Sequence, residues 1–324
     1  MINSSNELFS EFLKKFKEDK IEMQIIENSN QYDYYINKDN VNSVLQIIFN
    51  LCSSNEYCFS IGRENYGQIN VKVFEKKSTE VTTLNLFTEI TNNSQDLLEK
   101  KYKKDTYNLK KLNIIPVIGP DGVGKSTLLD AVINKLDERI FFKRFKKIVR
   151  NSIIYNIFHP INKNAVRKIV GKISIKNQHD DIHYLLCIWG ALTAYPYLIF
   201  QSLFRKNIVL LDRFFYDYFL ENISFMNKTT VLRKNWKKLI KIVPRTYALI
   251  HLDADSEIIL SRKQELSADD IETYRTLNFT LYLEKPSIIY LYVNTALELE
   301  QCKEIILYTG IESKIFNKGV NLDK

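Results

Sequence analysis

Glycine is scarce in this chain, with nine in 324 residues, and proline, cysteine and histidine are scarcer still. The cysteines lack the paired spacings of a zinc site or a disulfide framework, and they are Cys52, Cys58, Cys187 and Cys302. We therefore expect reduced thiols in a cytoplasmic protein. His179 and His183 have the i, i+4 spacing of metal ligands, but the Glu-centred motif of a zinc enzyme is missing around them, which favours solvated or hydrogen-bonded side chains.

Negative charge is also in deficit, because the formal net charge is +8 at pH 7. Such a balance favours anionic partners, namely nucleotides, nucleic acid or a lipid surface, or it reflects a lysine-rich solvated surface. The amino terminus has no basic-then-apolar pattern of an export signal, which agrees with a cytoplasmic location. Apolar residues make up 45% of the chain, enough for a sizeable core, and global disorder is excluded.

Three of the nine glycines fall within GPDGVGKST, residues 119–127. The spacing is that of a phosphate-binding loop, G-x-x-x-x-G-K-[ST], in which glycines let backbone amides approach a polyphosphate. A strand-like run at 113–119 precedes it and an amphipathic helix follows. The predicted nucleotide-binding residues are Gly119, Pro120, Asp121, Gly122, Val123, Gly124, Lys125, Ser126 and Thr127.

Each residue of the loop has an expected role if ATP is the ligand. The amides would bind the β-phosphate, Lys125 would bridge the β and γ oxygens, and Ser126 would ligate Mg²⁺. Thr127 would cap the helix locally or contact the α-phosphate.

Two further segments supply candidate catalytic groups. Asp212 ends an apolar strand at 207–212, where its carboxylate is expected to act as a Mg²⁺ ligand or base, and Arg213 beside it can clamp a phosphate. Residues 252–285 contain Arg262, Lys263 and Arg275 around a short polar stretch between two predicted helices, as expected of a lid that closes over ATP.

The order of patterns predicts an α/β chain with a P-loop NTPase fold, a parallel sheet flanked by helices, preceded by a small α+β domain. Strand and helix alternate from residue 113 onward, whereas residues 1–90 combine two helical runs with five strand-like runs. Residues 91–112 are polar and basic and are predicted to be a linker. The phosphate-binding domain is assigned to 113–311 and a tail to 312–324.

Residues 185–204 carry no charge and are long enough to cross a bilayer. A spanning helix would separate the phosphate loop from Asp212, although phosphoryl transfer needs the two close together. We therefore expect a buried helix, bent near Gly190 and Pro196 and packed against a sheet or in the interface of a homodimer.

Taken together, the three motifs resemble those of the thymidylate kinase family and its P-loop relatives. GPDGVGKST looks like the family's loop, including Asp121; Asp212-Arg213-Phe214 looks like its Asp-Arg-aromatic signature; and residues 261–282 resemble the lid of thymidylate kinase-like proteins. The resemblance covers about 113–311. It implies that Lys125 and Arg262 contact ATP phosphates, that Arg213 contacts the acceptor phosphate, and that Asp121 contacts an acceptor hydroxyl or the metal.

This chain departs from the family in residues 139–164, the region that corresponds to the segment after the second strand of thymidylate kinases. The Phe/Tyr-Arg-Glu-Pro stretch of thymidylate kinases is absent, and residues 139–150 are instead basic and aromatic. A second basic segment spans 231–245. Both are predicted to be ordinary amphipathic surface helices, and recognition of an anionic acceptor or contact with a membrane surface stays open for each.

The first ninety residues resemble nucleotidyltransferase-like modules, in which an Asp-x-Asp pair and a later acidic residue bind metal. The corresponding positions hold Asp33, Tyr35 and Asn85, so two of three carboxylates are replaced. Metal-dependent nucleotidyl transfer needs that concentration of negative charge, and the module is predicted to be structural or to dock a partner.

These patterns lead to one function and two alternatives. The chain is expected to be an ATP- and Mg²⁺-dependent kinase that transfers the γ-phosphoryl group to a small acceptor, either a nucleoside monophosphate such as dTMP or a sugar or glycan precursor. A nucleotide-binding regulatory or docking module without turnover is the alternative. Nucleic-acid binding comes third, because only the net charge motivates it.

Overall fold

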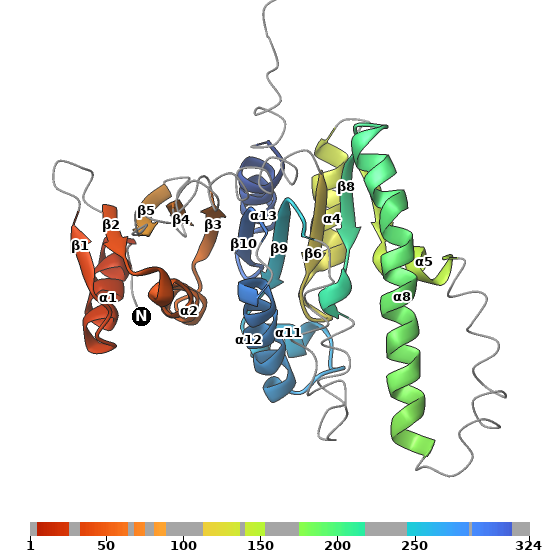
Figure 1. Cartoon of the computed structure of the whole chain (residues 1–324), viewed down its shortest axis with the longest axis horizontal. Helices are drawn as coiled ribbons and strands as arrows, with labels where there is room; N and C mark the ends of the chain where they lie inside the picture. Colours follow the sequence, from red (N-terminus) through yellow and green to blue (C-terminus); the bar gives the residue numbers. More distant parts are fainter. Residues whose placement is uncertain are drawn as a thin grey trace, which may run out of the picture.

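One ten-stranded sheet runs through the molecule in the order β1-β2-β5-β4-β3-β10-β9-β6-β8-β7 (Figure 1). The computed structural model describes residues 5–25, 33–63, 68–74, 81–88, 113–136, 140–152, 175–217, 245–284 and 287–312. The strands are β1 (Met23–Ile25), β2 (Asp33–Ile36), β3 (Cys58–Arg63), β4 (Gln68–Phe74), β5 (Val81–Thr88), β6 (Ile114–Ile118), β7 (Ile140–Arg144), β8 (Ile208–Asp212), β9 (Ala248–Asp253) and β10 (Ile289–Asn294).

The helices that cover this sheet are mostly short. They are α1 (Ser5–Glu18), α2 (Val41–Ser54), α4 (Lys125–Lys135), α5 (Phe145–Arg150), α8 (Ile175–Leu203), α11 (Ser256–Arg262), α12 (Ala268–Glu284) and α13 (Leu299–Ile305). A 3₁₀ turn, Lys38–Asn40, leads into α2, and a π-helical segment, Ile306–Glu312, continues α13. The chain is therefore a mixed α/β protein with a sheet flanked by helices.

The carboxyl-terminal strands form a parallel arrangement around β6. β6 pairs with β8 on one side and with β9 on the other, while β7 lies outside β8 and β10 lies outside β9. The chain thus leaves β6 toward one edge of the sheet and later crosses to the other. In open α/β sheets, ligands bind at the carboxyl ends of the strands where the strand order reverses in this way.

The amino-terminal strands extend the same sheet. β2 and β5 are parallel, and the remaining pairs among β1 to β5 are antiparallel. β3 pairs antiparallel with β10, with Ile61 opposite Tyr290. Main-chain hydrogen bonds therefore join the first ninety residues to the phosphate-loop half. The linker predicted at 91–112 and the tail beyond residue 312 lie outside the described residues.

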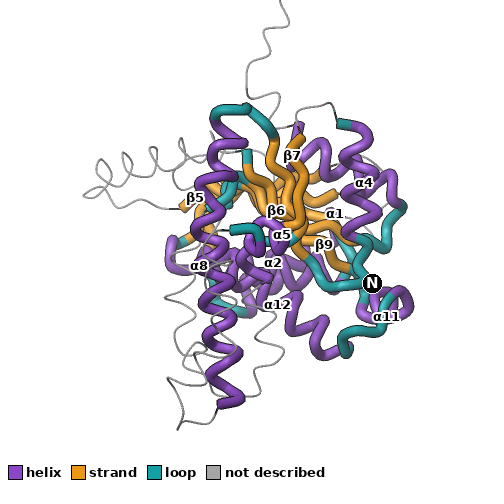
Figure 2. Tube along the Cα trace, turned by 90° about the vertical axis from the view of Figure 1, so that its right-hand side faces the viewer, coloured by secondary structure: helices purple, strands orange, loops and turns teal. Residues whose placement is uncertain are grey.

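Alternation along the strands divides the core between the two faces of the sheet. On β10, Tyr290 and Tyr292 pack in the cluster that contains α1, α2, α5, α8 and α12, whereas Leu291 and Val293 pack with α4, α11 and α13. The period of two in strand side chains produces this division. Figure 2 shows the strands with α8 and α12 on one side and α4 on the other.

One sequence prediction about helices is wrong. The predicted amphipathic helix at 139–150 begins with a strand, because residues 140–144 pair with β8 at the sheet edge and only 145–150 are helical. The apolar helix predicted at 185–204 is confirmed as α8, which buries Ala191 and Leu198 in the core, whereas other described side chains are exposed. Its large exposed apolar residues include Trp189, Tyr197, Phe200 and Leu203.

Three further findings concern the apolar helix α8, membrane spanning and the basic segment 231–245. α8 continues through Pro196 as a single helix. Within the described part of the chain, no helix has the length and hydropathy needed to cross a membrane. Of the basic segment 231–245, only Arg245 lies among the described residues.

Candidate functional site

The predicted phosphate loop connects β6 to α4 at the carboxyl edge of the sheet. Gly119, Gly122 and Gly124 have φ values of 150°, 91° and 92°, a region that other residues seldom adopt. A Cβ atom on Gly119 would lie 2.4 Å from the carbonyl oxygen of Leu252, which belongs to β9. Glycine is required there because the loop passes directly against the neighbouring strand.

The loop ends at the amino terminus of α4, which is open to an anion. Gly124 occupies the capping position and supplies no side-chain cap. The first amides of any helix lack intrahelical acceptors, and the helix dipole adds partial positive charge at that end. At the carboxyl end of β6, these amides form a site suited to phosphate.

Lys125 is folded back onto the loop that precedes it. Its side chain is buried, and its ammonium donates hydrogen bonds to the carbonyls of Gly119 and Pro120, at 2.7 Å each. The carboxylate of Asp121 lies 3.6 Å away. Burial and, secondly, the charge of Arg213 lower the pKa of Lys125 to about 8, against the opposing effect of Asp121. The ammonium is thus held at the loop by two carbonyls and by the carboxylate of Asp121.

One carboxylate oxygen of Asp212 has no partner among the described residues. Asp212 ends β8 opposite Arg144 in the register, and the two side chains approach to 3.4 Å between Nε and Oδ2. Its Oδ1 is buried and accepts no hydrogen bond from the part of the chain that the structure describes. Burial raises the pKa of this carboxyl, although Lys125 and Arg213 oppose the shift.

An orphaned carboxylate oxygen of this kind suits a cation. The hydroxyl of Ser126 is on an exposed residue at the start of α4. Mg²⁺ commonly takes one or two protein ligands and completes its shell with water and substrate phosphates. Among the described residues, no group of three or more His, Cys, Asp or Glu side chains could hold a metal alone. Asp212 and Ser126 therefore fit Mg²⁺ delivered with a nucleotide.

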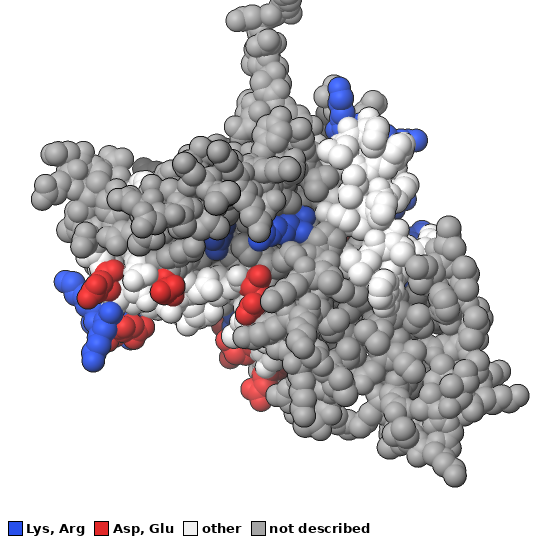
Figure 3. Space-filling model, in the orientation of Figure 1, with Lys and Arg blue, Asp and Glu red and all other residues white. Residues whose placement is uncertain are grey.

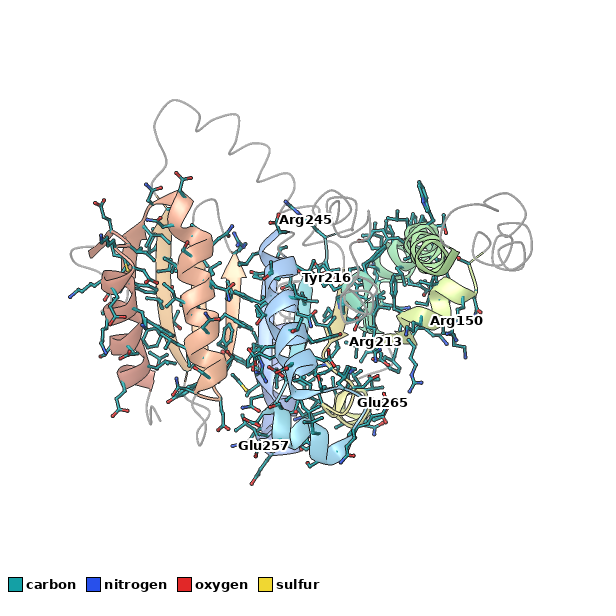
Figure 4. The ribbon with its side chains drawn as sticks, turned by 90° about the horizontal axis from the view of Figure 1, so that it is seen from below. Arg150, Arg213, Tyr216, Arg245, Glu257 and Glu265 are labelled. Carbon is teal, nitrogen blue, oxygen red and sulfur yellow. The ribbon has the colours of Figure 1, made fainter. Side chains whose placement is uncertain are left out.

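Arg213 lies between two carboxylates, and Figure 4 shows it between α12 and α5. Its guanidinium contacts Asp121 through Nη2 and Asp217 through Nη1, the latter at 3.2 Å. Burial alone would raise the pKa of Asp121, but Arg213, Lys125 and Lys263 together lower it. The backbone of Arg213 has φ 70°, and its amide donates to Val117 of β6.

Asp217 is a site residue that the sequence analysis missed. It is buried, and it accepts hydrogen bonds from the amide of Phe214 at 2.8 Å and from the hydroxyl of Tyr274 at 2.5 Å. With the contact to Arg213, it links the end of β8 to α12. The available signal was an acidic residue directly after three consecutive aromatics, FFYD, since a carboxylate in such surroundings needs partners.

The predicted lid residues separate into two groups. Arg262, at the end of α11, donates to the carbonyl of Val123 at 3.4 Å and to Thr295 at 3.2 and 3.3 Å, so it lies against the loop. Arg275 points elsewhere, to the buried Asp253 and the carbonyl of Ala254. Residues 263–267 join the two helices, and Ser267 and Asp270 cap α12 through reciprocal hydrogen bonds.

The structure thus gathers Asp121, Lys125, Asp212, Arg213 and Arg262 around the loop, with Ser126 and Thr127 exposed beside it. Other candidates lie apart from it. His179 and His183 fall in the part of α8 whose side chains are not described. In the amino-terminal half, Asp33 of β2 is the register partner of Asn85 of β5, so the backbone brings together two of the three positions suggested for the metal cluster.

The chain matches no protein-family model. It also matches no curated protein. Inference about its function therefore depends on the geometry of the site.

Proposed function

We propose that this chain is an ATP- and Mg²⁺-dependent phosphotransferase that moves the γ-phosphoryl group to a small acceptor. The observation that supports it most is the unpaired Oδ1 of Asp212 beside a glycine loop that carries a buried lysine. Arg213 and Arg262 add guanidinium groups on either side of that loop. Positioning and charge neutralisation are the main requirements of phosphoryl transfer, and these groups supply both.

The residues of the site would bind two different parts of the ligand, the phosphates of ATP and the Mg²⁺ ion. On ATP binding, Lys125 exchanges its two carbonyl contacts for oxygens of the β- and γ-phosphates, while the loop amides and Arg262 hold the remaining charge. Asp212 and Ser126 would hold Mg²⁺, which neutralises charge on the phosphates when bound.

The guanidinium of Arg213 favours an acceptor that already carries a phosphate. A part-buried guanidinium with a planar fork of donors is suited to bidentate phosphate contact. An acceptor phosphate would compete with Asp121 for the guanidinium, while Asp217 keeps it in place. A nucleoside monophosphate such as dTMP and a phosphorylated sugar or glycan precursor both meet this requirement.

The test is a Lys125→Ala variant assayed for acceptor-dependent ADP release. Loss of a preorganised charge at the transferring phosphate is expected to lower kcat by about 10²-fold or more. The matched control is Lys135→Ala, since Lys135 lies on the same helix and pairs with Glu304 at the surface. Full turnover in Lys125→Ala, with Mg²⁺ and either class of acceptor, would end the proposal.

A nucleotide-binding module without turnover is a second candidate. The pairing of β3 with β10 favours it, because a ligand at the loop would be linked through the sheet to the amino-terminal half. Such a module would show thermal stabilisation by ATP and no ADP release with any acceptor. A kinase would show thermal stabilisation by ATP and also ADP release in the presence of its acceptor.

A further inference from the structure

A cavity of about 430 Å³ lies at the edge of the sheet farthest from β1, between β7, α5 and the middle of α8. Figure 1 shows α5 and α8 side by side at that end of the molecule. Residues of all three elements line it, including Phe141, Lys143, Lys147, Asn151, Thr193 and Tyr197. None of these residues belongs to the phosphate loop.

The cavity opens on a different face of β7 from the phosphate site. Phe141 packs with the core cluster that contains α5 and α8, and Lys143 has the same parity along the strand. Arg144 therefore points to the other face, where it contacts Asp212. The two sites are neighbours across one strand, but a ligand in the cavity does not occupy the phosphate loop.

One wall of the cavity is aromatic. The rings of Phe141 and Tyr197 pack edge to face, with centroids 5.8 Å apart and planes at 76°. Tyr197 is 47% exposed although its ring is large. Figure 3 shows the described part of α8 as a surface with few charged residues. The exposed ring of Tyr197 is available for a flat ligand to cover.

Two cations also line the cavity. Lys143 places its ammonium 6.0 Å from the centroid of Phe141, and Lys147 lies on α5. Neither lysine forms an ion pair with a carboxylate of the described residues. The lining contains no acidic side chain, and Asn151 adds an amide donor. Two unneutralised cations beside an aromatic wall favour an anion with a planar ring.

We propose that this cavity is a second ligand site, which binds a small aromatic anion: a flat ring bearing a phosphate, sulfonate or carboxylate group. The ring packs on Phe141 and Tyr197, and the anionic group lies between Lys143 and Lys147. The volume is within the range of small-molecule sites and accommodates one or two fused rings with a charged substituent. The inference does not depend on the proposed kinase activity.

The test uses 8-anilinonaphthalene-1-sulfonate as the anionic probe and N-phenyl-1-naphthylamine, its analogue without the sulfonate, as the neutral one. Fluorescence titration of the full chain gives the dissociation constant of each. Lys143→Gln/Lys147→Gln should weaken binding of the sulfonate about tenfold and leave the neutral dye within about twofold. Tyr197→Ser should weaken both dyes, because it removes the aromatic wall that they share.

Lys14→Gln/Lys17→Gln makes the same change of charge on α1, at the other end of the sheet, and should leave both dissociation constants unchanged. Saturating Mg²⁺-ATP and the Lys125→Ala variant should also leave sulfonate binding unchanged, which separates this result from that of the kinase assay. The proposal is overturned if the sulfonate fails to bind the wild type at about 1 mM. It is likewise overturned if the Lys143/Lys147 variant binds normally, or if the α1 control loses as much affinity.

Discussion

Arg213 illustrates, at the scale of one residue, how the site keeps an unfavourable conformation. A positive φ costs a non-glycine residue about 1–3 kcal/mol unless the surroundings enforce it. Here the amide of Arg213 donates to Val117, and the guanidinium is held by Asp121 and Asp217. The sequence analysis identified Arg213 as a phosphate contact, but it did not predict Asp121 and Asp217 as its partners. Asp121 lies 92 residues earlier in the chain, so only the fold brings it to Arg213.

His251 makes the stability of the fold depend on pH. It is fully buried in β9, where Nδ1 shares a 2.7 Å hydrogen bond with Tyr290 and Nε2 has no partner. Burial lowers its pKa to about 3. In the unfolded chain the pKa is about 6.5, so between these values the unfolded state binds the additional proton.

Stability from His251 should therefore fall as the pH drops below about 6.5, at up to about 1.4 kcal/mol per pH unit. Urea unfolding of the wild type and of His251→Gln between about pH 6 and about pH 4 measures this contribution. We expect a shallower dependence in the variant, because glutamine does not titrate. Carboxylates contribute equally to both proteins, and identical slopes would contradict the assignment.

At the scale of elements, α12 connects the candidate site with the amino-terminal half. Tyr274 contacts Asp217 beside Arg213, and Arg275 contacts Asp253 at the end of β9. One turn later, Phe279 stacks on Phe49 of α2 at 4.1 Å between centroids. The sequence predicted this helix as part of a lid. Its packing shows that α12 is anchored at two carboxylates, while Arg262 of α11 contacts the loop.

Tyr274→Phe tests the anchoring of α12. Removing the hydroxyl leaves the buried carboxylate of Asp217 with one partner fewer, which should lower the free energy of unfolding by about 1.5–3 kcal/mol. Urea denaturation followed by circular dichroism measures the loss. Tyr308→Phe is the matched control, because Tyr308 is 60% exposed and should unfold like the wild type. Equal midpoints for Tyr274→Phe and Tyr308→Phe would show that the hydrogen bond contributes nothing.

At the scale of the whole molecule, the two halves share a sheet and an aromatic core. β3 and β10 exchange main-chain hydrogen bonds, and Phe59 stacks on Tyr292 at 5.1 Å across that seam. Unfolding one half alone would break these main-chain hydrogen bonds and expose the aromatic core of the other half. The described residues on both sides of residues 89–112 are thus expected to unfold as one unit.

Phe49→Ala provides the corresponding measurement. Truncating this buried ring, which contacts Phe59, Phe279 and Tyr292, should cost about 3–5 kcal/mol. Differential scanning calorimetry should show one transition, shifted as a whole to lower temperature, with equal calorimetric and van't Hoff enthalpies. Leu299→Ala, at a 47% exposed position, serves as the control. Two transitions, of which only one moves, would refute a single cooperative unit.

By itself the sequence determined what depends on neighbours along the chain. The spacing of Gly119, Gly124 and Lys125 predicted a loop between a strand and a helix, and the strands predicted at 113–119 and 207–212 are found at 114–118 and 208–212, because backbone conformation and the period of two are local properties. Tertiary structure alone decided the rest. β7 is a strand because β8 offers its edge, Asp217 becomes a site residue because α12 brings Tyr274 to it, and β3 joins β10 although more than two hundred residues separate them. Such pairings depend on which surfaces meet after collapse, and no local pattern encodes that choice.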